Sequence, residues 1–295
     1  MNAAAMNRSL ARRRVRAAAV IGRRQLKEAL IGAGWWVSLT AALLAAHFVV
    51  TLFAASLDSS GFNPDRTPVA GQLARMLTGA FGATLVETLF AEGPFLLALF
   101  AAALPVLGWL AMASVFRFGI EKNAGAVELL VYGPVDGTAY CLASFLRDAA
   151  LATTALVAIL AFLGIEALTG GMILGPRFFA ALAAIWLASL SVAALGILCS
   201  VIAGGAASAL AMFAGLMAAF LVVLAGSLTI SSAPVRAVSA AITWVVRWVS
   251  PVHYLALALR SRGFGLAGSL ALQGALAAAL LGASHLVIGR RGVRA

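Results

Sequence analysis

The longest uncharged stretch of the chain constrains its fold more than any other feature. From Phe178 to Val235 the sequence has 58 residues without Asp, Glu, Lys or Arg. An α-helix rises about 1.5 Å per residue, so one helix of this length would far exceed the roughly 30 Å hydrocarbon core of a bilayer. The stretch must therefore fold back, and Gly204-Gly205 is its best turn signal. It predicts two membrane-spanning helices, at 177–202 and 207–230.

The amino-acid composition indicates that most of the chain is surrounded by lipid rather than by water. Of the 295 residues, 63% are hydrophobic and 11% are charged, and the mean hydropathy is +1.04. A soluble domain is about half apolar and about a quarter charged, so this balance excludes a soluble enzyme or a disordered chain. The net charge of +11 in so apolar a chain indicates anionic headgroups and membrane topology rather than nucleic acid.

Four further stretches are long and apolar enough to cross a bilayer. Trp35 and Trp36 stand at the start of the first, where indoles favour the interface, and Pro94 stands in the first turn of the second. The expected spans are 34–56, 93–116, 148–168 and 266–288. The fold class is therefore an all-α membrane protein with six transmembrane helices in one domain at 34–289.

Amphipathic segments flank these spans. Eight basic residues between Arg8 and Lys27 alternate with apolar residues at near-helical spacing, namely Val15, Ala19, Leu26 and Leu30. They predict a cytoplasmic basic amphipathic helix within 1–33, with a disordered basic tail as the alternative. Residues 69–91 resemble a second surface helix. Residues 231–265 predict two short outer interfacial helices before the last span, broken at Ser250-Pro251, a cap followed by a first-turn proline.

Six spans place both chain ends on one side of the membrane. With the N-terminus inside, the inner segments carry about twice as many basic residues as the outer ones, and basic residues collect on the cytoplasmic side. We therefore expect a multi-pass protein of the cytoplasmic (inner) membrane, with its N-terminus and a 290–295 tail in the cytoplasm. Cys141 and Cys199 then lie near the cytoplasmic face, where a disulfide is not expected.

Few residues at membrane depth carry chemistry. His47 lies within the first span, and we favour a histidine bonded to a neighbouring helix over a substrate or proton role. Glu166 is expected at headgroup level. No His/Glu cluster has metal spacing, and neither lysine follows a glycine as a phosphate-binding loop requires. We expect no catalytic residue, no metal and no cofactor in this chain, so any ATP and magnesium would be bound by another chain.

The most informative segment follows the second span. Residues 117–147 are the most polar stretch after the N-terminus, and Ala126 to Tyr132 can form about two helical turns between Gly125 and Gly133-Pro134. Leu129 and Leu130 are apolar, whereas Glu121 and Glu128 are acidic. A short amphipathic helix of this kind is suited to docking in a groove on a cytosolic partner. Its acids argue against the alternative of a helix lying on anionic lipids.

This segment resembles the signature of permease subunits of type-2 ABC exporters. In that family the loop between spans two and three reads Glu-basic-x-x-Gly-Thr-x-Glu-x-Leu, followed by Pro-Val and, further on, by a Tyr and a Gly-Lys-Phe. The matching residues here are Glu121, Lys122, Gly125, Glu128, Leu129, Leu130, Pro134, Val135, Tyr140 and Phe145. Ala126 replaces the usual Thr, and Ala143-Ser144 replaces the Gly-Lys. The residues Ser250, Pro251, Val252, His253 and Tyr254 are similar to the family's Ser-Pro-Phe-x-His segment in the last outer loop.

The resemblance implies a function and a set of partners. The chain would be the transmembrane permease of an ATP-driven exporter, paired with a second permease subunit in a homo- or heterodimer and with cytosolic ABC ATPase subunits. A coupling helix near residues 125–133 would transmit closure of the ATPases to spans two and three. Two alternatives stay open: an ion-driven secondary transporter, which needs ionisable residues near the midplane, and a non-transporting scaffold that transmits force from an ATPase.

Overall fold

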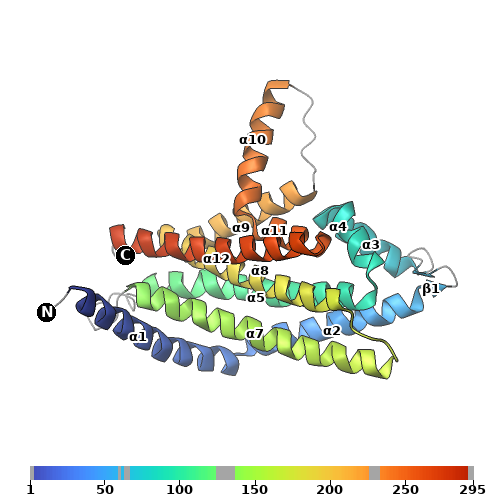
Figure 1. The fold of residues 1–295 in the computed structure, drawn as a ribbon, viewed down its shortest axis with the longest axis horizontal. Helices are drawn as coiled ribbons and strands as arrows, with labels where there is room; N and C mark the ends of the chain where they lie inside the picture. The colour runs from blue at the N-terminus through green and yellow to red at the C-terminus, as the bar shows by residue number, and fades with distance from the viewer. Residues whose placement is uncertain (1–2, 59–60, 63–66, 124–136, 226–232, 292–295) are drawn as a thin grey trace.

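The computed structural model of this chain is built almost entirely of helices that run side by side (Figure 1). It describes residues 3–58, 61–62, 67–123, 137–225 and 233–291. The described residues form eleven helices and one antiparallel pair of two-residue strands, β1 (Leu57–Asp58) and β2 (Gly61–Phe62). The helices are α1 (Ala3–Ile31), α2 (Ala33–Ala55), α3 (Pro68–Phe81), α4 (Ala83–Ala91), α5 (Pro94–Asn123), α7 (Gly137–Thr169), α8 (Pro176–Ile202), α9 (Ala206–Ala225), α10 (Ala233–Val249), α11 (Pro251–Arg260) and α12 (Phe264–Arg291).

Six of these helices are long and apolar enough to cross a membrane: α2, α5, α7, α8, α9 and α12. The chain is a multi-pass membrane protein with an all-helical transmembrane bundle. The start of α1, the end of α12, the end of α5 and the start of α7 lie at one end of the bundle, which we call the terminal end (Figure 1). The strands and α3 lie at the other, which we call the distal end.

Two spans extend well beyond their expected bounds. α5 continues to Asn123 rather than ending at 116, and α7 begins at Gly137 rather than at Asp148. The polar stretch therefore does not interrupt these helices where charge first appears. A helix bonds its own backbone groups and tolerates charged side chains once they find partners, as Arg117 does four residues from Glu121.

The expected surface helix at 69–91 is instead two helices, α3 and α4. Gly82 separates them with a φ of 83°, a conformation that residues with a Cβ rarely adopt. Thr67 caps the start of α3 and Pro68 occupies its first turn. The predicted break at Ser250-Pro251 is present between α10 and α11.

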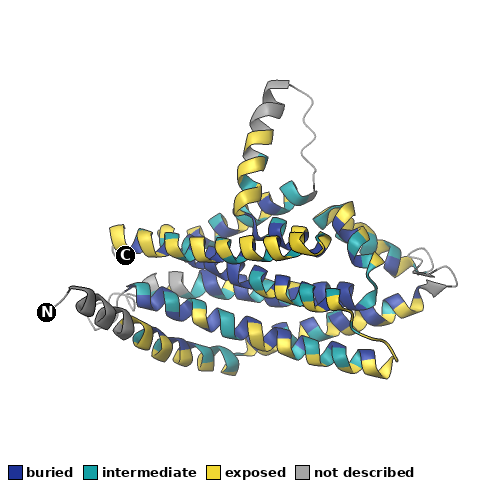
Figure 2. Cartoon of the chain, in the orientation of Figure 1, coloured by how far each residue is buried: buried dark blue, intermediate teal, exposed yellow. Residues whose placement is uncertain are grey.

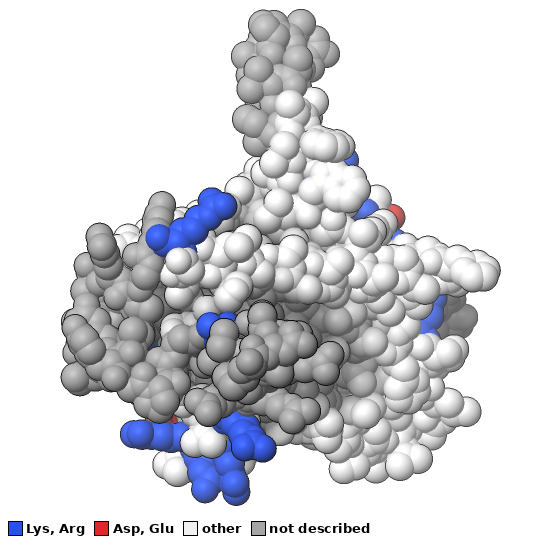
Figure 3. Space-filling view, turned by 60° about the vertical axis from the view of Figure 1, so that its left-hand side comes forward, with Lys and Arg blue, Asp and Glu red and all other residues white. Residues whose placement is uncertain are grey.

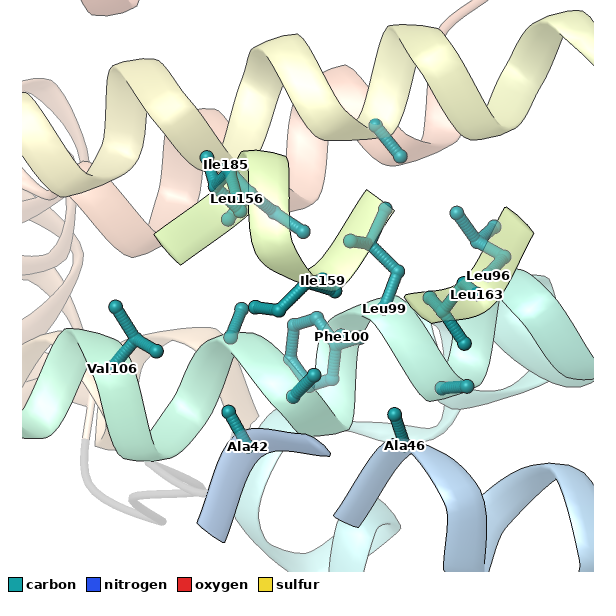
Figure 4. Packing of buried hydrophobic residues seen from close by; sticks show 14 of the residues in the cluster. Ala42, Ala46, Leu96, Leu99, Phe100, Val106, Leu156, Ile159, Leu163 and Ile185 are labelled. Atoms are coloured by element: carbon teal, nitrogen blue, oxygen red, sulfur yellow. The ribbon is translucent and has the colours of Figure 1, made fainter. Parts of the chain in front are cut away.

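The core is centred on α8. In the most apolar stretch of α8, 78% of the residues are buried within the protein, whereas the corresponding share is 17% in α9 and 22% in α12. A continuous apolar cluster joins Ala42 and Ala46 of α2, Leu99 of α5, Ile159 of α7 and Ile185 of α8 (Figure 4). Exposed residues line the outward face of α12 and the described part of α10 (Figure 2), so these faces have no cover within one chain.

Candidate functional site

The predicted coupling segment, residues 121–135, joins the terminal ends of α5 and α7. Gly125, Glu128, Leu129, Leu130, Pro134 and Val135 lie outside the described residues, as does the short helix expected there. Glu121 and Lys122 lie in the last turn of α5, which ends at Asn123. Tyr140, which belongs to the same family signature, is buried on α7 at 1% exposure, and Phe145 is partly buried.

A charge cluster lies directly before this segment. Arg117 donates from Nε to Glu121 Oε1 at 3.0 Å, and its Nη2 forms a close ion pair with Glu28 of α1. Glu28 also accepts from Arg24 at 3.0 Å. The hydrogen bond from Arg117 holds the pKa of Glu28 below its ordinary value against an opposing effect of partial burial. The cluster therefore ties the end of α5 to α1 at neutral pH.

α1 packs closely against α7, and of the apolar residues that the sequence singles out on α1, Leu26 and Leu30 pack partly buried against the core whereas Val15 and Ala19 do not. Val15 is 56% exposed and Ala19 is also exposed, whereas Ala18, Gly22 and Gln25 are buried. A Cβ placed on Gly22 would lie 3.1 Å from the backbone oxygen of Ala143. The small residues Ala143 and Ser144, which replace Gly-Lys of the family signature, therefore lie under α1.

Five Lys and Arg side chains in the described part of α1 are exposed rather than buried in this contact. Arg14, Arg16, Arg23, Arg24 and Lys27 are exposed. Figure 3 shows a dense group of basic side chains low in the view, where Figure 1 places α1, while most of the other described surface in this view is uncharged. This is the surface expected of a helix that meets anionic lipid headgroups.

Two adjacent residues of α7 form a buried ion pair next to the charge cluster. The Arg147 guanidinium donates to Asp148 Oδ1 at 2.8 Å from Nε and 2.5 Å from Nη2, and the two side chains are 2% and 0% exposed. Asp148 was expected at the start of a span, yet it lies in the fourth turn of α7. Its Oδ2 has no hydrogen-bond partner among the described residues. Arg147 also borders a cavity of about 440 Å³ with Arg117, Trp35 and Trp109.

The second predicted group forms a rigid corner between α10 and α11. Ser250 Oγ accepts from the His253 backbone N–H at 3.1 Å, and Pro251 occupies the first turn of α11. Tyr254 Oη donates to the Trp248 carbonyl oxygen at 3.1 Å. Burial, with Arg247 and Arg260 nearby, lowers the pKa of His253, so its imidazole is neutral at pH 7. These four residues fix the direction of α10 rather than forming a reactive site.

The structure also joins His47, expected within the first span, to Glu166, expected at headgroup level. His47 Nδ1 of α2 lies 2.9 Å from Glu166 Oε1 of α7. The side chains are 55% and 24% exposed. The expectation of a histidine bonded to a neighbouring helix is confirmed, and Glu166 is its partner.

Sequence reasoning missed a second ion-pair cluster, at the distal end. Arg177 at the start of α8 pairs with Glu92, which lies between α4 and α5, and Arg262 approaches the same carboxylate at 3.6 Å. The cluster joins the starts of α5, α8 and α12. In the sequence, the signal for this cluster is that Glu92, Arg177 and Arg262 are isolated charges beside long apolar runs. Their spacing does not indicate which of them form ion pairs.

An apolar groove of about 380 Å³ opens on one side of the bundle. Leu104, Gly108 and Met112 of α5 form one wall, and Phe213 and Met217 of α9 form the other. α8 lies beneath, and the first residues of α11 close the groove near Pro251 and Leu255. Every lining residue among those described is apolar or glycine.

Comparisons with known proteins do not indicate a function for this chain. No protein-family model matches the chain, and no curated protein is significantly similar to it. No group of three or more His, Cys, Asp or Glu residues within the described ranges has the arrangement of a metal site.

Proposed function

We propose that this chain is the membrane-spanning permease subunit of an ATP-driven exporter of the type-2 ABC class. It acts in the cytoplasmic membrane with both termini in the cytoplasm, beside a second permease subunit and a separate cytosolic ATPase that binds ATP and magnesium. The permease itself has no catalytic role. Its part is to convert movement of the coupling segment into movement of the spans.

The continuity of α5 carries this proposal. α5 has 30 residues from Pro94 to Asn123, or about 45 Å of helix. Its last turn leads into the coupling segment, and Leu104, Gly108 and Met112 on the same helix line the apolar groove. A displacement applied at Asn123 therefore reaches the groove through a single helix.

The charge cluster supports transmission to neighbouring helices. Arg117 binds both Glu121 and Glu28, so movement of the end of α5 is shared with α1. α1 in turn packs on α7, with Gly22 close to Ala143. A partner that grips the coupling segment would thus move α1, α5 and α7 together, which suits a transition between two arrangements of packed helices.

Replacement of two coupling residues tests the proposal. The permease is reconstituted with its ATPase subunit, sought first as a gene beside its own. Glu128→Ala with Leu129→Ala should lower permease-stimulated ATP hydrolysis at least about tenfold, because docked acidic and apolar anchors dominate such contacts. Membrane insertion should be unchanged. The matched control is Ile173→Ala, at a site 92% exposed between α7 and α8. Full ATPase stimulation in the double variant would contradict the proposal.

The His47–Glu166 pair favours a second candidate, an ion-driven transporter. A histidine and a carboxylate 2.9 Å apart on two spans can exchange a proton. The two candidates differ under ATP depletion with the ion gradient held constant. The exporter stops under these conditions, whereas the ion-driven transporter continues and loses its activity in His47→Gln.

A further inference from the structure

The cavity of about 440 Å³ lies where α1 passes into α2, beside the last turns of α5. Ala29 of α1, Gly32 between the two helices and Trp35 in the first turn of α2 form one side. Residues of α5 and Arg147 of α7 form the other. The volume lies in the range of small-ligand sites. A molecule bound here would contact α1, α2, α5 and α7 at once.

The cavity crosses the level at which the spans pass from hydrocarbon to headgroups. The apolar span of α2 begins at Ala33, and that of α5 ends at Arg117. Trp35 packs on Trp109 with ring centroids 5.4 Å apart, and indoles favour the boundary of the hydrocarbon. Arg117 lies eight residues beyond Trp109, or about 12 Å along α5 toward the terminal end. Lipid headgroups are therefore the molecules next to the charged part of the cavity.

The lining of the cavity changes from apolar to charged along α5. Trp35, Trp109 and Ala113 line the part nearer the middle of the membrane, whereas Arg117 and Glu121 line the part nearer the terminal end. A free inorganic anion would contact the charged part alone. A phospholipid fits both parts, because its phosphate and its acyl chains follow the same order across the membrane.

Two arginines of the lining retain hydrogen-bond donors. Arg147, whose side chain is 2% exposed, bonds Asp148 through Nε and Nη2. Arg117 bonds Glu121 through Nε and Glu28 through Nη2. Within the described ranges, the Nη1 group of each arginine has no hydrogen-bond partner. A guanidinium matches the geometry of phosphate oxygens, so both arginines can donate to one phosphate group.

The charge around the cavity favours an anion. The lining has two arginines and one glutamate, and that glutamate is already bonded to Arg117. Three basic residues are exposed on α1 in the two turns before the cavity, beside one acid, Glu28. These basic residues are Arg23, Arg24 and Lys27. Basic pockets between membrane helices bind anionic lipid headgroups, and nearby Lys and Arg residues attract such lipids. A zwitterionic lipid gains less from this excess of positive charge.

We propose that this cavity binds one anionic phospholipid. Arg117 and Arg147 hold its phosphate, and one acyl chain follows α5 past Ala113 to Trp109. The bound lipid joins α1, α5 and α7 at the level of the headgroups. This inference goes beyond the proposed function and is independent of it, because binding of the lipid needs neither an ATPase nor a second subunit.

Native mass spectrometry of the delipidated full chain in detergent tests the site. Palmitoyl-oleoyl phosphatidylglycerol should bind at least about fivefold more tightly than the phosphatidylcholine with the same chains. Arg117→Gln should weaken binding of phosphatidylglycerol at least about tenfold, because it removes charge-assisted hydrogen bonds to the phosphate. The matched control is Arg16→Gln, which removes an exposed arginine of α1 outside the cavity. It should leave binding unchanged.

Two further variants separate binding from folding. Arg147→Gln with Asp148→Asn removes the buried pair without leaving one charge unpaired, and it should also weaken binding about tenfold. Ala113→Phe fills the apolar part of the cavity and keeps every charge, so it should weaken binding of the lipid as well. Equal binding of the two lipids, or unchanged binding in Arg117→Gln and Ala113→Phe, would overturn the inference. Displacement of the lipid by an excess of inorganic phosphate would also overturn it, because the cavity would then be a site for free phosphate.

Discussion

Arg117 lies between two glutamates near the end of α5, and its side chain joins α5 to α1. Its partners are 45% exposed for Glu28 and 26% for Glu121, so each pair contributes roughly 0.2–1 kcal/mol to the free energy of unfolding. The cluster therefore contributes more to the positions of the helices than to stability. It fixes the position of α1 relative to α5 without making that position costly to change.

A double-mutant cycle measures this link. Glu28→Gln and Arg117→Gln should show a coupling energy of roughly 0.5 kcal/mol in unfolding experiments in detergent. Arg117→Gln with Glu87→Gln, an exposed acid on α4, should show none. Arg117 lowers the pKa of Glu28, so the coupling is present above the ordinary glutamate range and is lost as pH falls through the lowered pKa. A coupling energy that grows on acidification would contradict the assignment.

The buried Arg147–Asp148 pair differs from the cluster in energy. Both side chains are almost fully buried, and removal of one partner of such a pair costs about 3–5 kcal/mol because the other charge stays unpaired. The sequence indicates two charges beside a span. Only the packing of α7 against its neighbours shows that they are inside the protein and that Asp148 is not the start of a helix.

Among the elements, α5 and α8 approach each other closely. A Cβ on Gly196 of α8 would lie 2.5 Å from Ser114 Oγ of α5, and Ser200 Oγ donates to the Val115 carbonyl at 2.7 Å. Small residues allow backbones in a membrane to approach and allow hydroxyls to bond across helices. The central position of α8 depends on this contact.

Gly196→Ala should therefore separate α5 from α8. We expect a loss of about 1–3 kcal/mol in the free energy of unfolding, because the added methyl group displaces a bonded hydroxyl in a packed core. Gly164→Ala on α7 is the control, since a Cβ there meets nothing within 4 Å. Combining Gly196→Ala with Ser114→Ala should recover part of the loss. Equal stability of the two single variants would show that the contact is not tight.

At the scale of the whole molecule, orientation in the membrane is the property that the proposed function needs most. The terminal end carries the start of α1, the end of α12 and the two helix ends, of α5 and α7, that flank the coupling segment (Figure 1). An ATPase in the cytoplasm can reach that segment only if this end faces inward. The basic surface of α1 at the same end favours that direction, because basic residues collect on the cytoplasmic side.

Thiol labelling in intact cells tests the orientation. Val20→Cys, at an α1 position 72% exposed, should react with an impermeant maleimide only after the membrane is opened. Ile173→Cys between α7 and α8 should react without opening. The native Cys141 and Cys199 are buried and give a low background. The reverse pattern would place the coupling segment outside and exclude a cytosolic ATPase as its partner.

The number of spans followed from the sequence alone, because the cost of placing charge in lipid makes long uncharged runs span a membrane whatever their neighbours are. The corner at Ser250-Pro251 was equally local, since a cap and a first-turn proline act within one turn. The end of α5 and the start of α7 could not be predicted from local sequence, because a helix continues through charged residues when side chains from elsewhere in the chain pair with them.

The contacts between residues that are far apart in the sequence were decided by the tertiary structure. Glu28 with Arg117, His47 with Glu166, and Arg177 with Glu92 are each separated by more than eighty residues. Helix packing depends on which small residues face each other, and many arrangements of six apolar helices bury similar area. Hydrophobicity therefore determined that this chain enters a membrane, whereas close contacts between small residues, such as that of Gly196 with Ser114, decided which helices became neighbours within it.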